Sequence, residues 1–231
     1  LIAIGSIMGL SSQAFAVGEG FSIGLSGSNT GFYGVGKETV DHGSNTGQRT
    51  TTESGAFGAE IFSVLVEFDT GPVSFGIDYT FTDIDTPENV NRQGSGTRSC
   101  DSDNACGSDS TDVINKVSAT FENHTTLYAI VPVIWGTYIK AGMVYTDVVT
   151  TENLATGANY PDVSTEGYTV GIGYQQDMDN GLSIRVEATA AQYDDVSASS
   201  STPDSTETVA KKVDITDMMS ARGSISIVKS F

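Results

Sequence analysis

The amino-acid sequence predicts an all-β fold, namely an eight-stranded antiparallel up-and-down transmembrane β-barrel. Three observations predict it. Apolar residues alternate with small or polar residues at a period of two, such segments occur eight times, and short turns alternate with long polar stretches between them. A period of two places alternate side chains on opposite faces of a strand, and an even number of antiparallel strands is typical of membrane barrels.

The N-terminal residues predict export from the cytoplasm. Residues 1–10 are uncharged and mostly apolar, and Ala14-Phe15-Ala16 follows shortly after them. Signal peptidase requires small side chains at Ala14 and Ala16, and the apolar run is shorter than the roughly 20 residues that a spanning helix needs. We therefore expect residues 1–16 to be a signal peptide that lacks its first residues, and residues 17–231 to form one barrel domain. The alternative is a buried N-terminal helix of a soluble domain.

The clearest strand is predicted at residues 73–81, where large apolar residues share one face and Ser74, Gly76, Asp78 and Thr80 share the other. One large apolar face opposite one small polar face is the pattern of a half-buried strand. Three further segments repeat the pattern, at residues 168–174, 182–189 and 222–231. Weaker alternation predicts four more strands, at residues 21–25 with a continuation past Tyr33, 62–68, 117–133 and 139–145.

The connections between these segments are of two kinds. Residues 69–72, 132–136 and 177–181 are short and rich in turn-forming residues. Four long polar stretches alternate with them, at residues 41–55, 84–112, 147–165 and 194–210. An up-and-down membrane barrel has short periplasmic turns and long extracellular loops, and this alternation predicts that arrangement with both termini on the periplasmic side.

Composition agrees with such a barrel. Only 38% of the 231 residues are hydrophobic, and the mean hydropathy is near zero. Half of each strand in a membrane barrel faces a polar interior, so its hydropathy averages out. The formal net charge is −18, from 29 acidic and 11 basic residues. This argues against nucleic acid as a partner, because binding phosphate requires a surplus of Lys and Arg.

We assign the small and polar face of each strand to the interior, because an eight-stranded barrel is just wide enough for side chains to fill it. The Tyr, Phe, Ile and Val face then meets lipid. Aromatic residues at the segment ends are expected to form the two interfacial girdles. Those residues are Tyr79, Phe81, Tyr168, Tyr174 and Phe231.

With these features, residues 17–231 resemble the family of eight-stranded outer-membrane β-barrels that includes the opacity proteins and the barrels of OmpA and OmpX. The Ala14-Phe15-Ala16 site, the strand at 73–81 and the end at 224–231 carry the resemblance. It implies the outer membrane of a Gram-negative bacterium. It also implies that the barrel-assembly machinery recognises the terminal Phe231, with Ile225 and Ile227 on the same face. Lys229 departs from the pattern, since it lies on the lipid face, but near the membrane edge a lysine can reach the headgroups.

Six charged residues fall on the predicted interior face. Isolated charges there would be costly to desolvate, so we expect them to pair in a network that fills the lumen. The functional alternative is a charged constriction or gate. The six residues are Glu67, Asp78, Lys140, Arg185, Glu187 and Arg222.

The stretch at 99–112 holds both cysteines and many carboxylates. In an exported chain a Cys100–Cys106 disulfide is favoured over a metal pair or a catalytic thiol. Oxygen ligands from Asp101, Asp103, Asp109 and Asp112 would suit Ca²⁺. The EF-hand pattern fails at Ala105 and Cys106, however, and no Glu closes the loop. We therefore favour a solvated acidic loop and predict neither a metal nor a cofactor.

Catalytic motifs are absent from the sequence. Its two histidines are His42, in a predicted loop, and His124, on a predicted strand. No Gly-x-Ser-x-Gly, His-Glu-x-x-His or phosphate-binding glycine loop occurs. We predict a protein that is not an enzyme, although a Ser/His/Asp set assembled across strands around His124 stays open.

The predicted function is a structural or surface-interaction role, adhesion-like in kind. The alternatives are a narrow pore for small solutes and a soluble periplasmic β protein. The expected partners are outer-membrane lipids, lipopolysaccharide, the assembly machinery and an extracellular ligand that the sequence does not identify.

Overall fold

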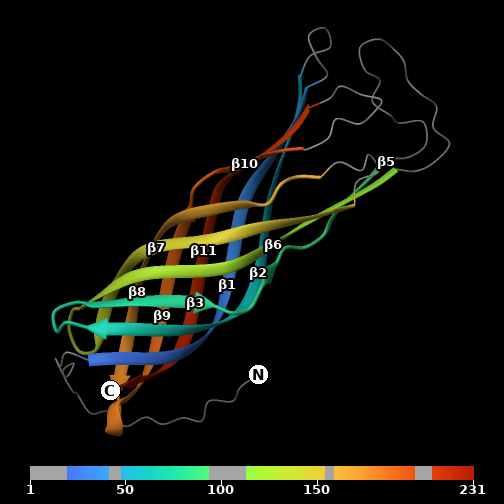
Figure 1. Ribbon diagram of the computed structural model, residues 1–231. Coiled ribbons are helices and arrows are strands. Elements are labelled where there is room, and N and C mark those ends of the chain that lie inside the picture. Colours follow the sequence, from blue (N-terminus) through green and yellow to red (C-terminus); the bar gives the residue numbers. More distant parts are fainter. Residues whose placement is uncertain (1–19, 42–47, 94–112, 154–158, 201–209) are drawn as a thin grey trace, which may run out of the picture.

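The protein forms one antiparallel sheet that closes into a barrel (Figure 1). The computed structural model describes residues 20–41, 48–93, 113–153, 159–200 and 210–231. The predicted signal peptide and the 99–112 stretch, with both cysteines and its four aspartates, lie outside these residues, as does His42.

Eight long strands build the wall, each antiparallel to the next, and β1 pairs with β11 to close it. This confirms the predicted fold. The strands are β1 (Gly20–Asp41), β2 (Gln48–Asp69), β3 (Ser74–Thr80), β6 (Val113–Pro132), β7 (Thr137–Asn153), β8 (Val163–Asp177), β9 (Leu182–Tyr193) and β11 (Ala210–Ser230). Three short strands continue the wall above β3 and β9. They are β4 (Ile84–Asp85) and β5 (Asn89–Gln93), which pair with β6, and β10 (Val196–Ser199), which pairs with β11.

The three short turns occur where the sequence predicts them, at the periplasmic end. Each contains a residue with positive φ, a conformation that glycine adopts without steric cost. Gly71 has φ 96° between β2 and β3, and Gly136 has φ 79° between β6 and β7. The β8–β9 turn is the short 3₁₀ helix Asp179–Gly181, in which Gly181 has φ 69°. No described helix has the length and apolar character needed to cross a bilayer.

The expectation of four long loops is wrong in part, because much of each stretch is strand. In 41–55 the pairing of β1 with β2 continues up to Asp41 and Gln48. The other three stretches contain β4 and β5, the end of β7 with the start of β8, and β10, respectively. Residues 50–56 are all exposed. Where both faces of a strand meet water, apolar residues have no preferred face, so the period of two disappears while the ladder continues.

The outer surface carries the apolar residues, as predicted. Two aromatic girdles, each defined by outward-facing exposed side chains, bound a band of exposed Ile, Leu and Val. The periplasmic girdle contains Phe21, Phe68, Phe75, Tyr174 and Phe231, and the extracellular girdle contains Tyr33, Phe62, Tyr79, Phe81, Tyr145 and Tyr168. A water-soluble barrel would bury this face, which removes the soluble periplasmic alternative. The chain is an integral membrane barrel of the outer-membrane type.

Candidate functional site

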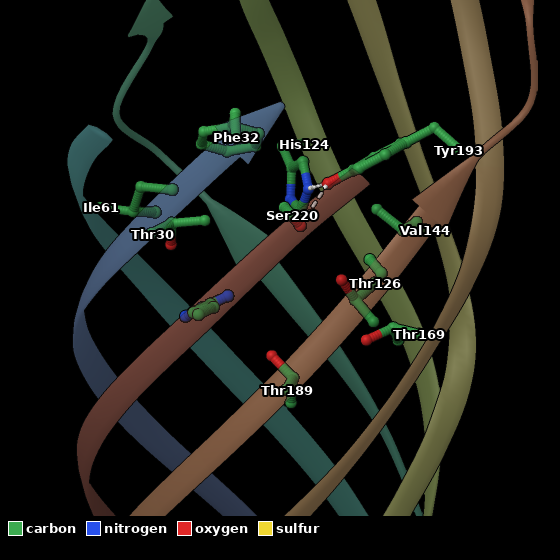
Figure 2. Close-up of a pocket in the computed structure, with 12 residues that line it drawn as sticks. Thr30, Phe32, Ile61, His124, Thr126, Val144, Thr169, Thr189, Tyr193 and Ser220 are labelled. Carbon is green, nitrogen blue, oxygen red and sulfur yellow. Dashed lines mark hydrogen bonds between the residues drawn. The ribbon is translucent and has the colours of Figure 1, made fainter. Parts of the chain in front are cut away.

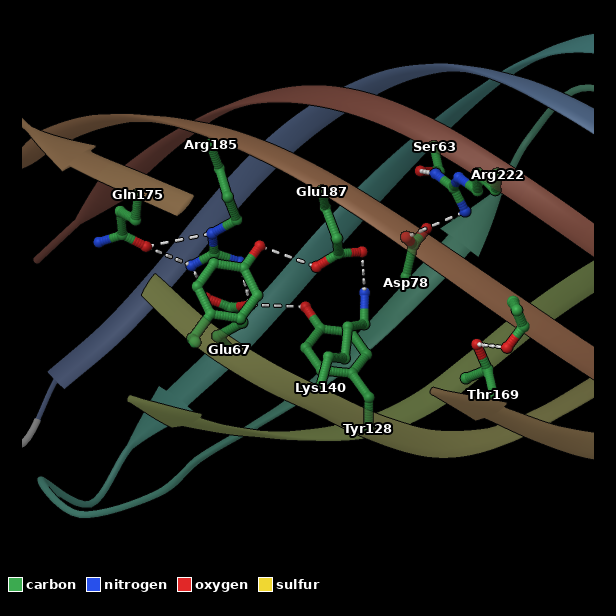
Figure 3. A network of polar contacts seen from close by, with 12 residues as sticks. Ser63, Glu67, Asp78, Tyr128, Lys140, Thr169, Gln175, Arg185, Glu187 and Arg222 are labelled. Carbon is green, nitrogen blue, oxygen red and sulfur yellow. Dashed lines mark hydrogen bonds and ion pairs between the residues drawn. The ribbon is translucent and has the colours of Figure 1, made fainter. Parts of the chain in front are cut away.

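The lumen near the periplasmic end is crossed by a charged layer, which we define as Glu67, Tyr128, Tyr138, Lys140, Arg185 and Glu187 (Figure 3). Its centre is the pair of Glu67, from β2, and Arg185, from β9. Arg185 Nη1 donates to Glu67 Oε1 at 2.5 Å, and Nη2 donates to Oε2 at 2.8 Å. The two residues are 4% and 6% exposed. Such a two-point contact between a guanidinium and a carboxylate is the strongest form of ion pair.

A second pair extends the charged layer across the lumen. Lys140 Nζ donates to Glu187 Oε1 at 2.9 Å, and the hydroxyl of Tyr138 donates to Glu187 Oε2 at 2.8 Å. The Tyr128 hydroxyl donates to Glu67 Oε1 at 2.7 Å, and Lys140 Nζ lies 3.9 Å from the centre of the Tyr128 ring. Each charge in the layer therefore has an opposite charge and a hydroxyl or ring beside it, which compensates its desolvation.

Glycines on the neighbouring strands make room for the two tyrosine rings. Gly76 of β3 is paired with Tyr128, and Gly173 of β8 is paired with Tyr138. A Cβ atom at Gly76 would collide with the Tyr128 ring, and one at Gly173 would collide with the Tyr138 ring. Each ring lies across its partner glycine, so these glycines shape the charged layer.

A third ion pair lies nearer the extracellular end. Arg222 Nη1 is 3.3 Å from Asp78 Oδ2, and Arg222 Nη2 donates to Ser63 Oγ at 3.0 Å. Asp78 Oδ1 and Arg222 Nε have no hydrogen-bond partner among the described residues. The structure thus places all six predicted interior charges in the lumen and joins them as three ion pairs.

A small cavity of about 30 Å³ lies beside Arg222, and both polar and apolar side chains line it (Figure 2). His124 Nε2 is 3.1 Å from the Tyr193 hydroxyl, which is 3.3 Å from Ser220 Oγ. The hydrogen bonds that Ser220 and His124 make within the described lumen both go to Tyr193 and do not join the two, so these residues do not form a Ser/His/Asp set. Thr30 Oγ1 and His124 Nδ1 line the cavity without a partner among the described residues. The volume suits one or two water molecules and no larger ligand.

The extracellular part of the lumen contains two apolar clusters, which the sequence does not predict. The first is Phe32, Ile61 and Ile84 with Phe57, Ala59 and Phe121, and the second is Val144, Tyr193, Val196 and Met218 with Val163, Ala191 and Ile215. The sequence does place Phe32 and Ile61 at inward-facing positions of their strands. The other inward-facing residues of the predicted strands are mostly small or polar, and the two apolar residues interrupt that pattern.

The barrel wall is interrupted beside the first cluster. Pairing between β2 and β3 ends at Ser63 and Thr80, and one more backbone hydrogen bond follows, from Phe81 N to Phe62 O at 3.2 Å. Beyond it β4 and β5 pair with β6 instead of β2. We call this gap between β2 and β4–β5 the seam.

Aromatic packing closes the seam from inside. The Phe32 ring stacks on Phe57 of β2 with a centroid distance of 5.0 Å and on Phe121 of β6 with one of 6.0 Å. The three rings therefore join the two sides where backbone hydrogen bonds are missing among the described strands.

The C-terminal residues lie on the outer face at the periplasmic end. Phe231 is 75% exposed, its backbone N–H donates to Phe21 O at 2.9 Å, and Ile225 and Ile227 share its face. Lys229 Nζ donates to the Asn180 carbonyl and lies 5.5 Å from the Phe231 ring centre. The proposed recognition of Phe231 by the assembly machinery stays a prediction.

Among the described residues no group of three or more His, Cys, Asp and Glu side chains is arranged to hold a metal ion.

No protein-family model and no curated protein matches the chain. Several solved structures are similar. The outer membrane protein OprG from Pseudomonas aeruginosa has 11% identity and a TM-score of 0.48, with 91% of this chain and 96% of that chain covered. The outer membrane protease OmpT from Escherichia coli has 10% identity and a TM-score of 0.45, with 91% and 97% covered. The outer membrane protein AlkL has 11% identity and a TM-score of 0.44, with 98% and 97% covered.

Proposed function

We propose that this protein is a closed, non-enzymatic barrel of the cell outer membrane whose extracellular end serves surface interaction of an adhesion-like kind. The observation that carries the proposal is the charged layer. Its two ion pairs, each with both partners almost fully buried, cross the lumen between β2, β7 and β9. A solute moving through would have to separate charges that are already desolvated, and breaking a buried pair costs about 3–5 kcal/mol.

The extracellular end supports a surface role through its extent and its charge. The β1–β2 and β10–β11 pairs continue beyond the extracellular girdle. The described charged side chains there are mainly acidic, and the basic ones are Lys37, Lys116 and Lys212. Such a surface beside anionic lipopolysaccharide favours bridging by divalent cations. The acidic residues are Glu38, Glu53, Glu60, Asp83, Asp85, Glu88, Glu122, Asp147, Glu152, Asp162, Glu166, Asp194, Asp195, Asp214 and Asp217.

Two measurements test the proposal. In planar lipid bilayers we expect no stable single-channel conductance, and a large stable conductance would overturn the closed barrel. In cells, each extracellular connection is deleted in turn and the adhesion of the cells is measured. Heat-modifiable gel mobility is the control for folding. Loss of binding in a folded deletion variant supports the surface role, since the barrel tolerates loop changes. Unchanged binding in every variant contradicts it.

A narrow pore for small solutes is the second candidate. The cavity beside Arg222 favours it, because the unpartnered polar groups of its lining can hold water within an otherwise filled lumen. Swelling of liposomes that contain the protein distinguishes the two. Uptake of small sugars or ions above that of empty liposomes would favour the pore.

A further inference from the structure

The extracellular part of β2 is a free sheet edge in the described structure. From Gln48 to Ile61 this strand pairs with β1 on one side, and the seam lies on its other side. Figure 1 shows β2 staying beside β1, whereas β5 runs beside the start of β6. A free edge presents backbone N–H and C=O groups that another extended chain can pair with.

The last contacts at the base of the seam identify the residues whose backbone groups face the edge. Phe62 O accepts from Phe81 N, and Phe62 N donates to Thr82 Oγ1 at 3.2 Å. Both backbone groups of Phe62 therefore point away from β1. In an antiparallel ladder alternate residues point the same way, and the β1–β2 register runs without a shift to Asp41 and Gln48. Among the described strands, the backbone groups left without a strand partner are those of Thr50, Thr52, Ser54, Ala56, Gly58 and Glu60.

The protection of this edge against pairing is limited to two acidic residues. Proteins protect free edges with Pro, charged side chains, bulges or very short strands, and the charges here are Glu53 and Glu60. Residues 50–60 contain no Pro and no Lys, the strand is long, and its ladder with β1 has no bulge.

The surroundings of the seam are acidic. Glu53 and Glu60 lie on β2, and Asp83, Asp85 and Glu88 lie on the opposite side, where Lys116 pairs with Glu88 at 2.8 Å. The Glu53 carboxylate accepts from Asn89 Nδ2 at 3.5 Å, so the two sides meet through side chains there. A partner strand that carries Lys or Arg on alternate residues would place its charges among these carboxylates.

We propose that the free edge of β2 between Thr50 and Glu60 binds an extended, basic polypeptide segment as an added β-strand. The backbone hydrogen bonds of the edge supply affinity that does not depend on sequence, and the acidic flanks select positive charge. The inference rests on the proposed surface role and names the class of its partner.

The test uses the purified full chain in detergent and a labelled peptide of about ten residues with alternating Lys and Val, the length of a typical strand. Ala56→Pro removes an edge-facing N–H without removing a hydrogen bond to β1, and Ala56→Val is the matched control that keeps it. We expect the proline variant to bind about tenfold more weakly, the effect of one or two lost hydrogen bonds. The control should bind like the parent chain.

Two peptide controls complete the design. A peptide that is N-methylated at every residue cannot pair through either of its edges and should not bind, and this arm applies even if Ala56→Pro fails to fold. A Glu-Val peptide should bind more weakly than the Lys-Val peptide, with the difference shrinking in salt. Equal binding to the proline and valine variants, or by the methylated peptide, overturns strand addition. Equal binding by the acidic peptide overturns the charge selection. Either result leaves the conductance and deletion tests of the surface role unaffected.

Discussion

The periplasmic and extracellular halves of the barrel close their lumens by different means. In the periplasmic half the wall is a continuous ladder of hydrogen bonds, and the interior is filled by paired charges around Glu67 and Arg185. In the extracellular half the wall is interrupted at the seam, and the interior is filled by apolar clusters. The comparison shows that a polar core is tolerated where the wall is complete, whereas apolar packing takes over where the ladder stops.

The membrane explains where the change occurs. In hydrocarbon an unpaired backbone group costs several kcal/mol, so a membrane barrel cannot leave its wall open there. The seam begins at Phe62 and Phe81, which belong to the extracellular girdle. Beyond the girdle water can satisfy the free backbone groups, and the interruption is therefore permitted. The start of the seam marks the outer boundary of the membrane.

The largest expected effect breaks the charged layer. Glu67→Ala leaves the buried guanidinium of Arg185 without its carboxylate and should destabilise the barrel by about 3–5 kcal/mol. The matched control is Glu88→Ala, which breaks the exposed pair with Lys116 and should cost about 0–1 kcal/mol. Urea unfolding in lipid vesicles, followed by heat-modifiable mobility, measures both. A similar loss of stability in the two variants would show that the charged layer stabilises the barrel no more than an exposed ion pair does.

Phe32→Ala tests the other half of the comparison. Phe32 is 8% exposed and stacks on both sides of the seam, so its loss should cost about 3 kcal/mol. Hydrogen exchange should accelerate in the extracellular parts of β1, β2 and β6. The periplasmic parts of the same strands serve as the internal control and should keep their protection. Uniform acceleration along whole strands would show that the two halves do not open separately.

The sequence predicts the part of the barrel within the membrane better than the part beyond it. Within the membrane every strand has one lipid face and one lumen face, so alternation locates the strands and places residues such as Glu67 and Arg222 inside. Beyond the membrane both faces of a strand meet water, and the sequence predicts loops where the extended ends of β2 and β7 lie. The seam exists because β4 and β5 pair with β6 and not with β2. Both possible partners are distant in sequence, so no local sequence pattern predicts which of them is chosen.

The pairing of individual charges was also beyond the sequence. Alternation places Lys140 and Glu187 on the inner face, but their meeting depends on the stagger of strands around the closed barrel. The tyrosines of the charged layer were missed for a related reason. Tyr128 and Tyr138 resemble girdle residues by type, and they fit inside because Gly76 and Gly173 lie opposite them.

Gly173→Ala tests how tightly the charged layer is packed. The added methyl group would collide with the Tyr138 ring, whose hydroxyl donates to Glu187. Overpacking of this kind costs about 1–3 kcal/mol. Gly223→Ala is the matched control, because a Cβ atom there meets nothing within 4 Å. Unfolding in urea should separate the two alanine variants, and equal stability would indicate that the tyrosine ring moves aside without loss.

The smallest expected effect concerns Tyr160, in the described part of the connection between β7 and β8. Burial raises the pKa of Tyr160 to about 12, and the nearby carboxylates of Glu38 and Glu152 act in the same direction. An unfolded tyrosine has a pKa of about 10, so the folded state holds the proton more tightly, and the contribution to stability is lost as pH rises from about 10 to about 12.

Tyr160→Phe removes this dependence at a single position on the extracellular side. Unfolding in urea at pH 8 and pH 11 should therefore show a larger loss of stability for the parent chain than for the variant, and the other tyrosines cancel because both proteins contain them. A variant that loses as much as the parent would mean that Tyr160 is hydrated like an exposed residue. The packing of the extracellular half would then end below Glu38 and Glu152, closer to the girdle than the contacts of Tyr160 with Thr150 and Glu152 indicate.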